Sequence, residues 1–266
     1  MGRIIGVCNQ KGGTGKTTTA INLSAYFAFA NKKTLLVDMD PQGNATSGIG
    51  INSDKFLSNS IYDVLLKGLP ISRSIIQTDW ANLSVVPSDI SLTGAEIELV
   101  SMPERETCLK KTLQLVKDEF EYIIVDAPPS LGILTVNVLA AIESVLVPIQ
   151  CEYYALEGVS QLIHTIDLIK ENVNYFLEIE GILLTMADFR TRLTLQVIDE
   201  VRKFFKEKAF NTIIPRNVKL AEAPSFGKPI NYYDPFSVGA KAYLNLAEEI
   251  LHEKIEMFVG IRQRSE

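Results

Sequence analysis

The chain has 266 residues, of which 47% are hydrophobic and 22% charged, the balance of a globular protein with a substantial core, and its net charge of −6 argues mildly against a nucleic-acid partner for the chain as a whole. No apolar run reaches the roughly 18–20 residues of a membrane span, and the start of the chain does not have the pattern of a signal peptide. Three scattered cysteines and two histidines form neither a disulfide framework nor a zinc motif, so we expect a cytosolic protein with buried thiols.

Short β-branched apolar runs alternate with segments of helical periodicity. Strands are predicted at residues 4–7, 34–37, 83–86, 122–125, 144–149, 179–186 and 212–214. Helices are predicted near residues 17–30, 61–66, 109–120, 135–141, 156–171, 195–208 and 239–258. Continuous apolar strands separated by helices predict an α/β fold with a mostly parallel sheet and helices on both faces. We interpret residues 1–266 as a single domain, in which 255–266 form a frayed C-terminal tail.

The first strand leads into a glycine-rich loop, CNQKGGTGKTT at residues 8–18, and then into a helix. This order of elements is the context of a phosphate-binding loop. Glycines let backbone N–H groups turn inward around phosphate oxygens, and the helix N-terminus adds partial positive charge. Lys16 is placed for the β- and γ-phosphates and Thr17 for Mg²⁺. The predicted nucleotide-binding residues are Gly12, Gly13, Thr14, Gly15, Lys16, Thr17 and Thr18.

The head of this loop departs from the ordinary pattern. Gln10 stands where that pattern has a glycine, and a second lysine, Lys11, follows it. A lysine at this position can cross a subunit interface and meet the phosphates of a partner. The form KGGTGKT is the deviant phosphate loop of one subfamily of P-loop ATPases.

Carboxylates follow two of the predicted strands, in the segments DMDPQGN at 38–44 and DAPP at 126–129. The carboxyl ends of parallel strands share the edge where ligands bind, so these acids are expected beside the phosphate loop. Asp126 is the candidate ligand of Mg²⁺, directly or through water, and Asp40 is the candidate base that positions an attacking water. Asp38 is equally well explained as the cap of a helix or turn. The prolines and glycines nearby make 40–50 and 126–134 candidate switch segments.

Five segments together resemble the ParA/Soj partition ATPases in their short form. They are the lysine-headed loop, 38–44, DAPPSL at 126–131, QCEYYALEG at 150–158 and IPRNVKLAEAPSFGKP at 214–229. The resemblance implies an ATPase, stimulated by a partner and by DNA, that forms a nucleotide-sandwich homodimer with ATP and Mg²⁺. It also implies non-specific DNA binding, a centromere-binding partner of the ParB type, and a cytoplasmic, nucleoid-associated protein without stable membrane association.

The resemblance also assigns roles to single residues. Lys11 is the signature lysine that reaches across the dimer, and Gly12 lies where the subunits meet closely. Asp40 prepares the water. The remaining carried-over positions are Lys16 and Thr17 for phosphate and Mg²⁺, Asp126 at the second motif strand, Pro215, Arg216 and Asn217 beside the adenine, and Arg190 for DNA.

Basic residues are dense between 190 and 241, although the whole chain is acidic. Few aromatic residues interleave them, so the expected mode is contact with backbone phosphates rather than base stacking. From the residues alone, an ordinary solvated basic face explains the pattern equally well, and the family resemblance favours DNA. The candidate DNA-binding residues are Arg190 in a loop, Lys203 and Lys206 on one side of the following helix, and Lys219 and Lys228 in a Pro-rich loop.

Three alternatives share features with this interpretation. A membrane-surface positioning ATPase of the MinD kind needs a basic amphipathic C-terminal helix, for which residues 255–264 are short and poorly patterned. An electron-transfer protein like nitrogenase iron protein needs cysteines near the switch segments, and 126–134 has none. A nucleotide-binding scaffold with negligible hydrolysis is disfavoured because Lys16, Thr17 and Asp40 are all present.

Overall fold

One sheet of eight strands runs through the residues that the computed structural model describes, which are 2–52, 54, 56, 59–152 and 155–256. The strand order is β3-β4-β2-β5-β1-β6-β7-β8, and every neighbouring pair is parallel except β3 with β4. The predicted α/β class with a mostly parallel sheet is therefore confirmed. The strands are β1 Arg3–Val7, β2 Thr34–Asp38, β3 Ile76–Gln77, β4 Leu83–Val86, β5 Tyr122–Asp126, β6 Ser144–Gln150, β7 Glu178–Ala187 and β8 Ala209–Pro215.

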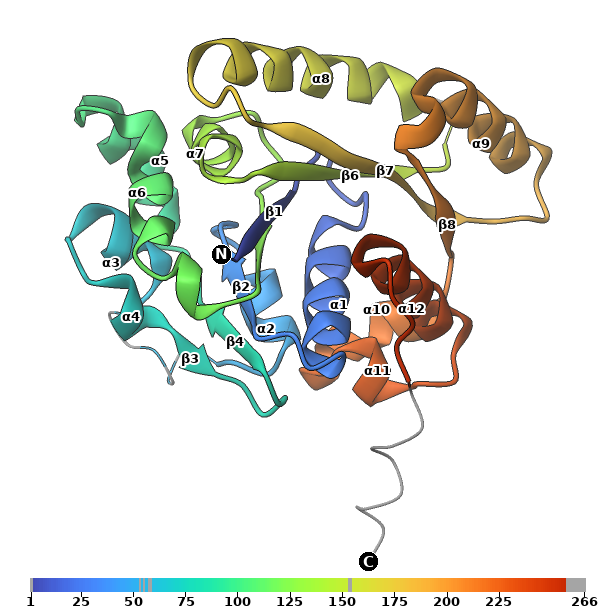
Figure 1. Ribbon diagram of the computed structural model, residues 1–266, viewed down its shortest axis with the longest axis horizontal. Coiled ribbons are helices and arrows are strands. Elements are labelled where there is room, and N and C mark those ends of the chain that lie inside the picture. The colour runs from blue at the N-terminus through green and yellow to red at the C-terminus, as the bar shows by residue number, and fades with distance from the viewer. Residues whose placement is uncertain (1, 53, 55, 57–58, 153–154, 257–266) are drawn as a thin grey trace, which may run out of the picture.

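Helices cover both faces of this sheet (Figure 1). Successive strand residues alternate between two apolar clusters, with Ile4 and Ile123 in one and Ile5 and Ile124 in the other. Both faces are therefore buried, which explains why the strands have continuous apolar sequences. The helices are α1 Lys16–Phe29, α2 Asn44–Gly48, α3 Ile61–Leu66, α4 Ile71–Ser74, α5 Leu92–Glu98, α6 Cys108–Gln114, α7 Ile133–Ala141, α8 Ala155–Asn172, α9 Arg192–Phe205, α10 Val218–Glu222, α11 Ile230–Tyr233 and α12 Val238–Leu251.

The helix that follows the phosphate loop, α1, lies between the sheet and α12. The Tyr26 hydroxyl donates to the Ala240 carbonyl of α12 at 2.7 Å, and the hydroxyls of Thr19 and Tyr243 lie 3.1 Å apart. Because α1 is covered on both sides, apolar residues surround it and no single apolar stripe marks its sequence. This packing holds the N-terminus of α1 firmly beside β1.

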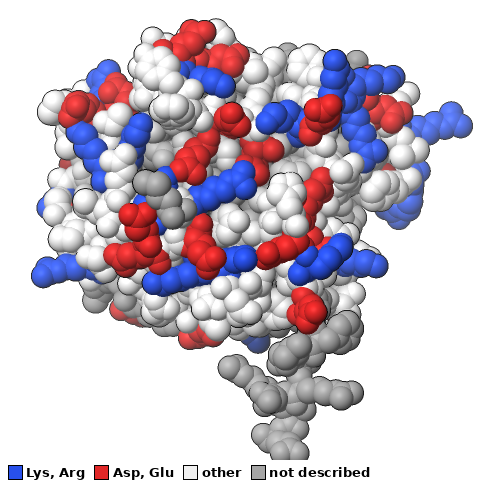
Figure 2. Space-filling view, in the orientation of Figure 1, with Lys and Arg blue, Asp and Glu red and all other residues white. Residues whose placement is uncertain are grey.

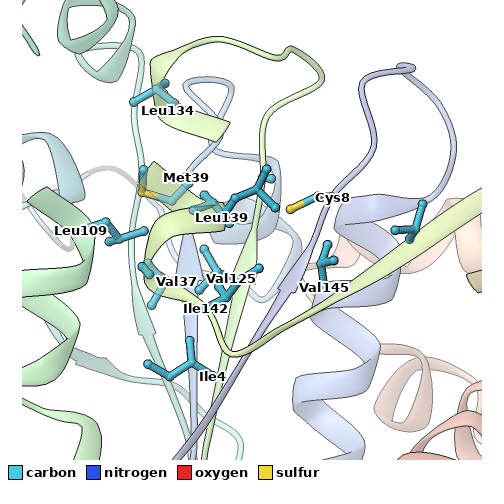
Figure 3. Packing of buried hydrophobic residues seen from close by; sticks show 14 of the residues in the cluster. Ile4, Cys8, Val37, Met39, Leu109, Val125, Leu134, Leu139, Ile142 and Val145 are labelled. Atoms are coloured by element: carbon cyan, nitrogen blue, oxygen red, sulfur yellow. The ribbon is translucent and has the colours of Figure 1, made fainter. Parts of the chain in front are cut away.

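The other face of the sheet packs against α7 and its neighbours, and Figure 3 shows this core close to the end of β1. Val37, Val125 and Val145 of three strands belong to the same cluster as Leu139 of α7, and all four are labelled in Figure 3. Cys8 is fully buried at the edge of the cluster, and burial raises the pKa of its thiol far above the ordinary value. Cys151 is buried as predicted, but Cys108 is only half-buried.

Several predicted element boundaries are wrong. The last helix was expected to reach residue 258 but ends at Leu251, because His252 takes a left-handed φ of 54° and the Glu248 carboxylate accepts a hydrogen bond from the Ile255 N–H. The helix expected at 109–120 ends at Gln114. The elements β3, α2, α4, α5, α10 and α11 were not predicted, and five of them have five residues or fewer, too few to give a readable period.

The predicted C-terminal tail lies largely outside the described residues, which end at 256. Among the residues that are described, none of the helices has the length and apolar character needed to cross a bilayer.

Candidate nucleotide site

The phosphate loop lies between β1 and α1, as the sequence predicts. Gly13 and Gly15 have φ values of 74° and 86°, which L side chains rarely adopt, and Gly15 is the N-cap of α1. A Cβ built on Gly12 would have no heavy atom within 4 Å. Nothing within the described chain therefore requires a glycine at position 12, and the exposed loop surface at 11–13 leaves room for close approach by a second molecule.

Lys16 lies inside the loop rather than in solvent. Its residue is only 6% exposed, and its ammonium donates to the Lys11 carbonyl at 3.0 Å. Burial lowers the pKa of Lys16, and the nearby negative charge of Asp126 acts against that change. The amine therefore sits at the centre of the loop, held by one neutral acceptor that a phosphate oxygen can replace.

Lys11 projects from the loop toward the junction between β6 and α8. Its ammonium lies 3.1 Å from the Glu152 carboxylate, and both side chains are about half exposed, at 45% and 48%. The Lys11 backbone N–H donates to Asn9, whose amide donates in turn to the Pro148 carbonyl of β6. The loop head is thus fixed to β6, while the Lys11 side chain makes an exposed ion pair of the kind that contributes little to stability.

Asp38 and Asp126 end adjacent strands and pair directly in register across β2 and β5. Asp38 is fully buried, and its oxygens accept hydrogen bonds from the Thr46 N–H at 2.8 Å, the Thr46 hydroxyl at 2.7 Å and the Asp40 N–H at 3.1 Å. Burial raises the pKa of Asp38 to about 6, and the hydrogen bonds from Thr46 oppose this rise. Asp38 therefore caps the first turn of α2 and holds the loop that carries Asp40, which agrees with the capping interpretation.

Asp40 lies in the loop between β2 and α2, at the same edge of the sheet. One carboxylate oxygen accepts from the Gln42 N–H at 2.9 Å, and the residue is 6% exposed. Its second oxygen makes no hydrogen bond of normal geometry with the described residues. The structure brings Asp40 to the same edge as the phosphate loop, but its predicted role with the attacking water stays a prediction.

Asp126 is fully buried, yet neither of its oxygens makes a hydrogen bond of normal geometry with a described residue. Burial, followed by the charge of Asp38, raises its pKa well above the ordinary value, while the Thr17 hydroxyl and Lys16 act against the rise. An unpaired buried carboxylate is costly, so such a group normally has a partner. A divalent cation fits this position, because Asp126 and Thr17 supply the two oxygens that Mg²⁺ uses beside phosphates and water.

No three His, Cys, Asp or Glu side chains converge into a ready-made cation cage in the part of the chain that the structure describes. This agrees with a Mg²⁺ site of few protein ligands, since Mg²⁺ usually keeps several waters and binds substrate phosphates.

A pocket of about 240 Å³ opens beside the loop, between the carboxyl ends of β7 and β8. The predicted adenine-side residues Pro215, Arg216 and Asn217 all line it. Gly15 and Thr18, which are predicted nucleotide-binding residues, line it as well. The walls that were not among the predicted site residues are Thr185, Met186, Ile214, Leu220, Ala221 and Tyr243. Thr185, Met186 and Tyr243 come from β7 and α12, far from the phosphate loop in the chain, and no predicted motif contains them.

Two features of β7 shape this pocket. The Thr185 hydroxyl donates to the Thr14 carbonyl at 2.8 Å, which ties this pocket to the phosphate loop. Met186 follows with a φ of 51°, an uncommon conformation for a methionine that turns the chain at the end of the strand. The backbone N–H of Arg216 donates to the Ala187 carbonyl, so the walls from β7 and β8 are joined.

The structure places the predicted DNA-binding residues on several separate elements. Arg190 lies in the turn between β7 and α9, and Lys219 lies in α10 after β8, next to the pocket-lining residue Leu220. Lys203 lies in the last turn of α9, whose 14 residues span about 21 Å. Lys206 is not on the predicted helix face, because it follows the helix end with a φ of 48°.

Lys219 and Lys228 are not in one open loop as predicted. Lys219 is helical, and Lys228 follows the short turn Ala223–Phe226. Lysine and arginine side chains gather at the upper right of Figure 2, over α9 in the orientation of Figure 1. Acidic side chains lie among them, so this face is mixed rather than uniformly basic.

A doubly covered parallel sheet, a phosphate loop after β1 and carboxylates at the ends of β2 and β5 define a P-loop ATPase. A family model described as "AAA domain" matches residues 2–179. Over 250 residues the chain is 55% identical to the sporulation initiation inhibitor protein Soj of Bacillus subtilis, covering 94% of this chain and 98% of that protein. It is 56% identical over 251 residues to the chromosome partitioning protein ParA of Myxococcus xanthus, covering 94% and 88%. The chain therefore belongs to the ParA/Soj family of chromosome-partitioning ATPases.

Among solved structures, the fold matches cobyrinic acid a,c-diamide synthase from Mycobacterium smegmatis with bound ATP analog and magnesium. The TM-score is 0.83 and the identity 35%, over 95% of each chain. Because that protein is named as a synthase, this likeness supports the nucleotide-binding fold. The partition assignment rests on the curated relatives.

Proposed function

We propose that this chain is an ATP-dependent switch that dimerises around ATP and Mg²⁺, binds DNA non-specifically and hydrolyses ATP to segregate or position chromosome or plasmid DNA. A ParB-type protein is the proposed partner that stimulates hydrolysis, and nucleoid association follows from the DNA binding. The observation that carries the proposal is the exposed surface of the phosphate loop at residues 11–13. Lys11 and Gly12 are exposed there, and a Cβ built on Gly12 would have no heavy atom of the described residues within 4 Å.

In the proposed site, Lys16 and the N-terminus of α1 bind the phosphates, and Thr17 and Asp126 hold Mg²⁺. The metal, when bound, offsets the phosphate charge during hydrolysis. Asp40 orients the attacking water and accepts its proton, since only one of its carboxylate oxygens accepts a hydrogen bond from the described residues. Pro215, Arg216 and Asn217 border the adenine.

For DNA, we propose sequence-independent contact between basic side chains and backbone phosphates. A dimer formed with ATP places two copies of Arg190 and of Lys219 on one assembly. Lys203, Lys206 and Lys228 extend the surface. We propose no stable membrane association, and sedimentation with anionic vesicles distinguishes this protein from a MinD-like one.

The decisive experiment is size-exclusion chromatography with light scattering in ADP, ATP and a slowly hydrolysed ATP analogue, with DNA added in a parallel run. The wild type is expected to become a dimer with the analogue, whereas Lys11→Ala is expected to stay monomeric in every state. Lys33→Ala is the matched control, because Lys33 is an exposed lysine that precedes β2, at the opposite edge of the sheet. Dimerisation of Lys11→Ala at wild-type strength would contradict the proposal.

A further inference from the structure

The turn between β7 and α9 carries an arginine that its own chain already neutralises. The Arg190 guanidinium donates from Nε to Oδ1 of Asp188 at 2.8 Å and from Nη2 to Oδ2 at 2.7 Å. The Arg190 backbone N–H also donates to Oδ1, and the Thr191 N–H donates to the Asp188 carbonyl. The Arg190 side chain is 88% exposed, so the pair stands on the surface in a turn that the backbone holds in place.

The positive charge of a second arginine, Arg216, also acts on Asp188. The hydrogen bonds from Arg190 lower the pKa of Asp188 to about 2, and the charge of Arg216 contributes to the same shift. Arg216 lines the pocket beside the phosphate loop, and its backbone N–H is bonded to Ala187. Asp188 is therefore ionised at neutral pH and interacts with two arginines, Arg216 of the pocket lining and Arg190, the candidate DNA contact.

The pairing is selective among the candidate DNA contacts. Arg190 and Lys219 each have a carboxylate partner, since Arg190 pairs with Asp188 and Lys219 lies 2.9 Å from Glu222. Within the described residues, no ion pair involves Lys203, Lys206 or Lys228. The acids thus accompany the two candidates that are nearest in sequence to pocket-lining residues, Arg190 after Met186 and Lys219 before Leu220.

We propose that Asp188 is an affinity-determining residue of the DNA-binding surface, which competes with DNA phosphate for Arg190. This inference rests on the proposed DNA binding. A carboxylate and a phosphate offer the guanidinium the same two-oxygen geometry, so one must leave before the other binds. Each subunit then binds DNA weakly through Arg190, and only a dimer with two such contacts retains it.

The test is Asp188→Asn, measured by fluorescence anisotropy on a labelled DNA duplex across a salt series, in ADP and in the slowly hydrolysed analogue. The variant is expected to bind up to about fivefold more tightly per subunit, the range of an exposed ion pair. Its plot of log affinity against log salt is expected to steepen by up to about 0.9 per subunit, the value of one phosphate contact.

Asp199→Asn is the matched control, because Asp199 is an exposed acid on α9 that takes part in no ion pair within the described chain. It removes the same charge from the same region without releasing Arg190. On an Arg190→Ala background, Asp188→Asn is expected to give no more gain than the control. Glu222→Gln tests the parallel pair at Lys219 in the same assay.

The outcomes separate the two claims. If the wild type binds DNA and Asp188→Asn binds no more tightly than Asp199→Asn, the competition is refuted while the proposed function stands. Weaker binding by Asp188→Asn also refutes it, since Asp188 would then be orienting Arg190 for the phosphate. If the wild type dimerises with nucleotide but shows no salt-sensitive DNA binding, the proposed function fails and this inference fails with it.

Discussion

Replacing Thr46 by valine tests whether the loop that carries Asp40 is held in place by one buried hydroxyl. Thr46 is 2% exposed, and its hydroxyl donates to Asp38 at 2.7 Å and accepts from the Ser88 N–H at 3.0 Å. Valine keeps the shape but removes both bonds. A hydrogen bond to a charged group contributes about 1.5–3 kcal/mol, and the Ser88 N–H left unpaired adds to the loss. We expect the free energy of unfolding to fall by about 3 kcal/mol, measured by urea denaturation.

The kinetics of ATP hydrolysis distinguish a displaced Asp40 from a general loss of stability. The phosphate loop contacts of Lys16 and Thr17 come from another segment, so KM for ATP should change little, whereas kcat should fall about tenfold or more as Asp40 loses its fixed place. Thr34→Val is the matched control. Thr34 begins β2, the strand that ends at Asp38, and its hydroxyl donates to the Lys32 carbonyl. This hydrogen bond between neutral groups contributes about 1 kcal/mol.

Thr46→Ser restores the hydroxyl and should restore kcat. The reasoning is refuted if Thr46→Val turns over ATP as fast as Thr34→Val under conditions where both are folded. It is also refuted if Thr46→Val lowers kcat and Thr46→Ser fails to recover it, because the methyl group rather than the hydroxyl would then be responsible.

Three further changes test other parts of the site. Asp40→Ala should keep ATP binding and trap the dimer while turnover falls about 100-fold or more, the lower range for a lost general base, and normal turnover would reject its assigned role. Arg190→Ala should weaken salt-sensitive DNA binding while ATP-dependent dimerisation persists, and unchanged retention across a salt series would count against the contact. Thr185→Val removes the bond to the Thr14 carbonyl and should raise KM for ATP with little change in kcat, whereas Thr185→Ser should behave as wild type; equal KM values for the two variants would show that the bond does not position the loop.

The sequence predicted the central strands, the phosphate loop and the placing of Asp40 and Asp126 because each depends on a short stretch of chain. Apolar runs such as 122–125 can only be buried on both faces of a sheet, and an acid directly after such a run must emerge at its carboxyl edge. The loop at 8–18 has its own signature in its glycines and lysines.

Features that depend on distant segments were not accessible in the same way. Thr185 meets Thr14 across 171 positions of sequence, and Lys11 meets Glu152 across 141. The left-handed conformations of Met186 and Lys206 have no marker in residue type, since neither is glycine or asparagine. The role of Asp38 stayed open because its partner Thr46 lies in a helix of five residues, too short to be predicted.

Asp38, Asp40 and Asp126 lie at the same edge of the sheet, but their carboxylates accept different numbers of hydrogen bonds. Asp38 accepts bonds on both oxygens, so it has little capacity left for a cation or a water. Asp40 accepts one, and Asp126, although fully buried, makes no bond of normal geometry with the described residues. A buried carboxylate costs stability unless something pairs with it, so we propose that Asp126 pairs with a bound ligand. The neighbouring acid Asp38 is satisfied internally and keeps Asp40 in position. We therefore propose that Asp38, with the most hydrogen bonds, holds the loop, that Asp40, with one, positions the attacking water, and that Asp126, with none of normal geometry, holds the metal.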